Sequence, residues 1–124
     1  MKQLPESLFC GTWRSYKLFL HTGEVKNHSK DKYLEFVFAD DRKLAISYHD
    51  NGKNKKLDET KDWSLAFKEK RYYLSVASKG LEYEVITINH TAFVVRDTQT
   101  LDKYFCARLK TWETYIKTTE PYTL

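Results

Sequence analysis

Residues 71–110 read RYYLSVASKGLEYEVITINHTAFVVRDTQTLDKYFCARLK. In this stretch, short runs rich in β-branched and aromatic residues are separated by turn-forming residues, a pattern typical of β-strands. Turn signals fall near residues 69, 79, 90 and 99, about one every ten residues. This regular spacing predicts consecutive hairpins in which each strand pairs with the next, which is a meander.

The same two-residue period extends toward the N-terminus. Leu34, Phe36 and Phe38 form one row of a strand, and Asn51-Gly52 suits a type I′ hairpin turn because both residues tolerate positive φ. No segment of about twelve residues or more shows a helical period. We therefore predict an all-β fold with eight strands, over residues 11–21, 32–39, 43–49, 61–67, 71–78, 81–89, 91–97 and 102–110.

Eight sequential antiparallel strands favour closure of the sheet. An open sheet leaves two unpaired edges, whereas a closed barrel has none. A barrel of about eight strands has an interior that is just filled by side chains or holds one small ligand. We expect an eight-stranded antiparallel up-and-down (meander) barrel, formed by a single domain over residues 1–124 with a core in residues 8–112. The polar residues 22–31 are expected to form a loop at one mouth.

The first and last predicted strands carry a motif. Gly11-Thr12-Trp13 opens the first strand, and Arg108 closes the last. This arrangement resembles the lipocalin/calycin superfamily, and over residues 8–112 the layout resembles its small bacterial lipocalin-like domains. The resemblance implies that Gly11, Trp13 and Arg108 close the barrel base, with the cation over the indole, a contact that contributes ~0.5–2 kcal/mol. It also implies binding of a small hydrophobic or amphipathic molecule without chemical change.

The first strand does not obey a simple two-residue period. Trp13 shares its face with Lys17, while a more apolar row points the other way. Either Lys17 reaches into the barrel, or a β-bulge near Arg14-Ser15 changes the phase of the strand. We favour the bulge, which would turn inward the side chains of Trp13, Tyr16, Leu18 and Leu20.

The two cysteines are predicted to be free thiols. If Trp13 lies opposite Arg108 in an antiparallel pair, the same register places Cys106 opposite Ser15, five residues from Cys10. At ~3.3 Å per residue this separation is roughly 16 Å, which is too far for a disulfide.

The aromatic content is informative about the interior. The chain has nine Tyr, seven Phe and three Trp, and core filling accounts for many of them. Tyrosines on inward rows indicate a partly wet interior, because a buried hydroxyl needs a partner or a water. Arg96 is out of phase with Phe93 and Val95, so it either points inward to an anionic head group or lies on the surface. The residues predicted to contact a ligand are Phe36, Phe38, Tyr48, Trp63, Phe67, Tyr72, Tyr83 and Arg96.

Catalytic and metal-binding patterns are not found in the sequence. The four histidines are scattered without a metal-binding spacing, and His21 and His28 are expected to lie in solvent. There is no Gly-x-Ser-x-Gly elbow and no glycine-rich phosphate loop. We therefore predict a protein that is not an enzyme and that has no metal and no cofactor.

Charge and hydropathy limit the partners. The formal net charge of +4 is modest and spread along the chain, so it does not indicate a particular anionic partner. No apolar run is long enough to form a membrane-spanning helix, and the N-terminus does not resemble a secretory signal. We expect a cytoplasmic protein, or a periplasmic or secreted one if a native signal was removed, that is a monomer or weak homodimer.

Two other functions stay open at this stage. A filled barrel could act as a protein-interaction module through the tail at residues 111–124, which carries Trp112, Tyr115, Ile116 and Tyr122. Binding of single-stranded nucleic acid is less expected, because it needs exposed aromatic residues in a basic groove.

Overall fold

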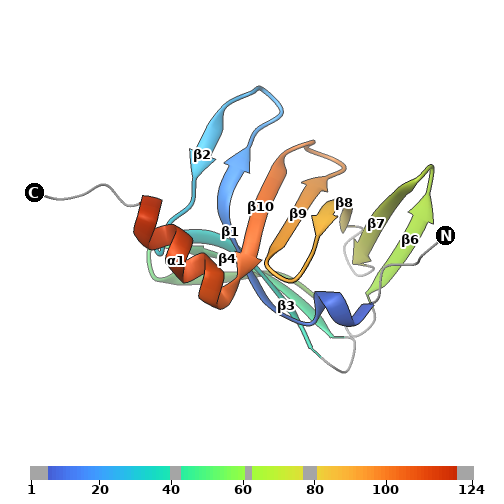
Figure 1. The fold of residues 1–124 in the computed structure, drawn as a ribbon, viewed down its shortest axis with the longest axis horizontal. Coiled ribbons are helices and arrows are strands. Elements are labelled where there is room, and N and C mark those ends of the chain that lie inside the picture. Colours follow the sequence, from blue (N-terminus) through green and yellow to red (C-terminus); the bar gives the residue numbers. More distant parts are fainter. Residues whose placement is uncertain (1–5, 40–42, 61–62, 77–80, 120–124) are drawn as a thin grey trace, which may run out of the picture.

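The computed structural model describes residues 6–39, 43–60, 63–76 and 81–119. Within these residues the protein is mostly β, with a ten-stranded antiparallel meander sheet followed by a C-terminal helix (Figure 1). The elements are the 3-10 helix η1 (Glu6–Phe9), β1 (Gly11–Phe19), β2 (Val25–Asn27), β3 (Lys32–Phe38), β4 (Leu44–Asp50), β5 (Lys53–Thr60), β6 (Ser64–Lys68), β7 (Arg71–Val76), β8 (Leu81–Ile88), β9 (Ala92–Asp97), β10 (Lys103–Arg108) and α1 (Leu109–Thr119).

The strands follow the order β5-β4-β3-β1-β10-β9-β8-β7-β6, and β2 also pairs with β1. The antiparallel meander is therefore confirmed, and the first and last strands are neighbours in the middle of the sheet. In the part of the chain that the structure describes, no backbone ladder joins β5 to β6. The hydrogen-bonded path is thus open, whereas the sequence predicted closure.

The predicted count of eight strands is wrong, and the mostly β fold that was predicted also carries a C-terminal helix. The sequence of β5, KNKKLDET, has a single apolar residue, Leu57. The sequence of this strand has no alternation of polar and apolar residues, and charged residues in a strand at a sheet edge discourage pairing with other chains. The strand β2 is only three residues long and lies in the predicted polar loop at residues 22–31. The predicted turn near residue 79 lies outside the described residues.

The helix α1 packs on the outer face of β1 and β10 (Figure 1). Trp112 and Ile116, one helical turn apart, are buried there beside Tyr33 and Ala107. The Trp112 indole N–H also donates to the Ser15 carbonyl at 2.9 Å. Two apolar residues of the predicted interaction tail, Trp112 and Ile116, are therefore buried against the protein's own sheet.

One aromatic core brings the two ends of the open sheet together. Phe38, on β3, packs edge-to-face against Trp63, which precedes β6, with ring centroids 5.3 Å apart. Leu44 of β4 and Val76 of β7 belong to the same buried cluster. Because strands from both ends of the path share one core, the sheet curls around it.

The base of the curled sheet is built around Trp13 and Arg108. The two residues are cross-strand partners, as predicted, and the Arg108 guanidinium carbon lies 4.2 Å from the centroid of the Trp13 ring. Arg108 also donates to the carbonyls of Leu8, Cys10 and His90 at 2.8, 2.6 and 2.8 Å. This one side chain therefore joins the N-terminal segment to the last strand and to the β8–β9 turn.

Both cysteines are free thiols, as predicted, and Cys106 does lie opposite Ser15. Complete burial raises the pKa of the Cys106 thiol far above its usual range. Cys106 therefore behaves as a small apolar core residue.

Replacing Gly11 with alanine should destabilise the protein by ~1–3 kcal/mol. Gly11 has a φ of +120°, and an added Cβ would lie 2.8 Å from Nη1 of Arg108. The matched control is Gly52→Ala, because Gly52 has a φ of +84° but open space around the Cβ position. Urea denaturation of both variants tests this contact: equal losses of stability would show that Arg108 does not restrict position 11.

Candidate functional site

A β-bulge in β1 organises the open end of the sheet. The register between β1 and β10 shifts between Ser15 and Lys17, so Tyr16 is the extra residue. The bulge was predicted, and it lies about one residue later than expected. The carbonyl of Tyr16 accepts a hydrogen bond from the His28 backbone N–H at 3.0 Å. The bulge therefore ties the segment after β2 to the first strand.

The bulge turns two side chains outward. Tyr16 packs against Tyr115 of α1 with ring centroids 4.8 Å apart, so its predicted inward position is wrong. Lys17 lies over Phe19 on the same outer side, 6.0 Å from the ring centroid. Both residues point away from the core because the extra residue puts two successive side chains on one face.

Behind the bulge, Ser15 and His28 form a buried hydrogen-bonded pair. Ser15 is fully buried, and its hydroxyl oxygen accepts from the Leu34 N–H at 2.8 Å. The same oxygen is hydrogen-bonded to Nδ1 of His28. Because a buried hydroxyl proton needs an acceptor, we assign that proton to the bond with Nδ1. The ring proton of neutral His28 is then on Nε2.

His28 is only 4% exposed, so its expected position in solvent is wrong. Burial, together with the smaller effects of the positive charges of Lys32 and Lys26, lowers the pKa of His28 to about 4. The imidazole is therefore neutral at pH 7. In the sequence, the only indication of a buried polar partner is Ser15, which has the same inward phase as Trp13, so that its hydroxyl needs a hydrogen-bond partner.

A cavity of ≈ 400 Å³ lies beside His28 at the open end of the inner face. Its wall is formed by β1 to β4 and the segment after β2, through Leu18, Lys26, Asn27, His28, Lys32 and Tyr48. Across the sheet from Leu18 lies Tyr104, whose pKa is raised to about 12 by burial and then by nearby acidic groups. Two lysines thus flank a wall of apolar and neutral polar side chains.

Apart from Arg96, the predicted ligand contacts divide into three groups. Phe36, Phe38, Trp63 and Tyr83 are buried and pack on one another in the aromatic core, which they fill. Phe67 and Tyr72 lie together on the β6–β7 hairpin, with ring centroids 4.7 Å apart, and Phe67 is largely exposed. Of the predicted contacts, Tyr48 is the one that lines the cavity.

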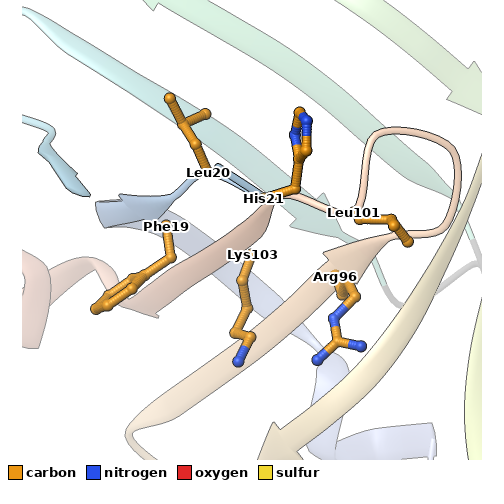
Figure 2. A pocket seen from close by; sticks show the side chains of 6 residues that line it. All are labelled: Phe19, Leu20, His21, Arg96, Leu101 and Lys103. Carbon is orange, nitrogen blue, oxygen red and sulfur yellow. The ribbon is translucent and has the colours of Figure 1, made fainter. Parts of the chain in front are cut away.

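Arg96 lies on the outer face, so a ligand on the inner face would not contact it. Its neighbour Val95 belongs to the core, while Arg96 points away and forms an ion pair with Glu84 at 3.6 Å. Figure 2 shows Arg96 extending to the same side of the strands as Phe19 and Lys103. The groove there, ≈ 380 Å³, is also lined by Leu20, His21 and Leu101.

The Ser15–His28 pair is structural. The Ser15 side chain is fully buried, and its oxygen accepts a hydrogen bond from the Leu34 N–H and is hydrogen-bonded to His28. A substrate therefore has no access to this hydroxyl. Within the described residues, no group of three or more His, Cys, Asp or Glu side chains could hold a metal ion. None of the described helices has the length and hydropathy to span a membrane.

Comparison with known proteins gave no match to a family model, a curated protein or a solved structure.

Proposed function

We propose that this protein is a non-catalytic, lipocalin-like binding protein that holds one small hydrophobic or amphipathic molecule. The observation that carries the proposal is the ≈ 400 Å³ cavity lined by Leu18, His28 and Tyr48. Ligand pockets are commonly concave spaces of roughly 300–1,000 Å³ with an apolar wall and a few placed polar groups. This cavity lies within that size range, and Leu18 and the ring of Tyr48 form an apolar part of its wall beside polar side chains.

In this proposal the curled sheet acts as a barrel. Its base is closed by Trp13 under Arg108, and side-chain packing of Trp63 on Phe38 spans the region where β5 and β6 share no ladder. Because aromatic side chains fill the core, the ligand occupies the open end and not the whole interior. The lipocalin/calycin resemblance is kept on the same grounds, the Gly11-Thr12-Trp13 motif and its contact with Arg108.

Titration with the neutral fluorophore N-phenylnaphthylamine tests the proposed function. We expect saturable one-to-one binding, and about a tenfold loss of affinity in Leu18→Trp, because the larger side chain occupies the cavity. The matched control is Leu101→Trp, in the outer groove of Figure 2, which should bind within about twofold of the native protein. Absence of binding, or equal effects of the two tryptophans, would refute a ligand site at the open end.

A further inference from the structure

We propose that the molecule bound at this cavity is an amphipathic anion, whose oxyanion head is held by Lys26 and Lys32 and whose apolar part lies against Leu18. This inference rests on the proposed function, because it specifies the chemical class of the ligand at the same site. It differs from the sequence-based expectation, in which Arg96 was the candidate for an anionic head group.

The two lysines of the cavity differ from those cations of the sheet that form ion pairs. On the outer face, Arg14 is paired with Glu35 at 2.8 Å, and Arg71 and Arg96 share Glu84. Lys68 lies 3.6 Å from Glu82. Within the residues that the structure describes, by contrast, neither lysine of the cavity forms an ion pair.

Among the described residues, the side chains that line the cavity are cationic, neutral polar or apolar. Asp50 lies opposite Lys32 in the β3–β4 ladder, yet the structure shows no ion pair between them. Two exposed lysine side chains, Lys26 and Lys32, therefore border the same cavity, and their positive charges attract an anion to it.

The remaining polar groups of the cavity also suit an anion. With Nδ1 engaged by Ser15, the assigned tautomer of His28 has its proton on Nε2, and no described residue accepts from that nitrogen. The Asn27 side-chain amide and the Tyr48 hydroxyl, which also line the cavity, add further possible donors. A cationic head group would instead meet two like charges.

A matched pair of probes separates head-group recognition from binding in general. Anilinonaphthalene sulfonate has the skeleton of N-phenylnaphthylamine with one added sulfonate. We expect the sulfonate to bind the native protein about tenfold more tightly than the neutral probe. Added sodium chloride should weaken binding of the sulfonate only, because salt screens charge interactions.

The decisive variant is Lys26→Met/Lys32→Met, which keeps the aliphatic length of both side chains and removes their charges. We expect it to weaken sulfonate binding about tenfold and to leave neutral-probe binding within about twofold. The control Lys103→Met removes a cation of the outer groove and should change neither affinity. Thermal melts of each variant verify that the fold is retained.

The outcomes distinguish the two proposals. If neither probe binds, the proposed function fails, and the head-group assignment fails with it. If both probes bind equally and the double variant changes neither affinity, the cavity binds ligands but the anionic class is wrong. If Lys103→Met, and not the double variant, weakens sulfonate binding, the anion sits in the outer groove and the assignment is overturned.

Discussion

Replacing Trp13 with alanine is expected to lower the free energy of unfolding by ~3–5 kcal/mol. Trp13 is fully buried, and it packs against Phe93 with ring centroids 5.4 Å apart. Its indole N–H donates to the Phe9 carbonyl at 2.8 Å. Alanine would remove these contacts, leave a cavity at the base of the sheet and take away the ring under Arg108.

Urea denaturation followed by circular dichroism measures this effect. Trp13→Phe is the matched control, because it keeps an aromatic ring and loses only part of the volume and the indole donor. The free energy of unfolding of Trp13→Phe should fall by ~1–3 kcal/mol. This variant can still be measured if Trp13→Ala does not fold. A loss in Trp13→Ala below about 1 kcal/mol would mean that the base is not a main support of the fold.

The second large effect is a loss of stability through His28 as the pH falls. The pKa of His28 is about 4 in the folded protein and 6.5 in an unperturbed chain. The unfolded state therefore takes up the proton first, and stability is lost as the pH falls from 6.5 toward 4. The full difference corresponds to ~3 kcal/mol, and below pH 4 no further loss arises from this group.

Comparison of the native protein with His28→Asn isolates this contribution. The variant cannot titrate at position 28, while its side-chain oxygen can still accept a hydrogen bond from Ser15. We expect the stability advantage of the native protein to shrink by up to ~3 kcal/mol between pH 7 and pH 4. His21→Asn serves as a control, because the side chain of His21 is 60% exposed. Parallel pH curves for native protein and His28→Asn would contradict burial of a neutral His28.

The candidate site was largely inaccessible to sequence reasoning. Tyr48 was predicted as a ligand contact because it lies on an alternating inward row, and it does line the cavity. Lys26 and His28 lie in or beside a strand too short to show a period. The position of His28 depends on its bonds to Ser15 and Tyr16, and contacts between segments that far apart leave no local signal.

An error in the phase of the first strand accounts for Tyr16, whose side chain was predicted to point inward and points outward. The bulge at Tyr16 reverses the inward and outward positions that follow it, and the two-residue period contains no information about where an extra residue sits. For Arg96 the period was correct: being out of phase with the core residue Val95, it lies outside with Glu84. A contact with an anionic head group would have required the Arg96 side chain to point inward, on the same face as Val95.

The sequence alone determined the antiparallel meander, because local alternation and turn chemistry mark consecutive hairpins. The meeting of Trp13 and Arg108 on the first and last strands was implied by the lipocalin/calycin resemblance, and the structure has this pair in register. Only the tertiary structure decided where the ladder stays open, that α1 covers the outer face, and that His28 is buried beside a cavity with two lysines. Each of these depends on side chains distant in sequence that compete for the same space, and no single segment determines such packing.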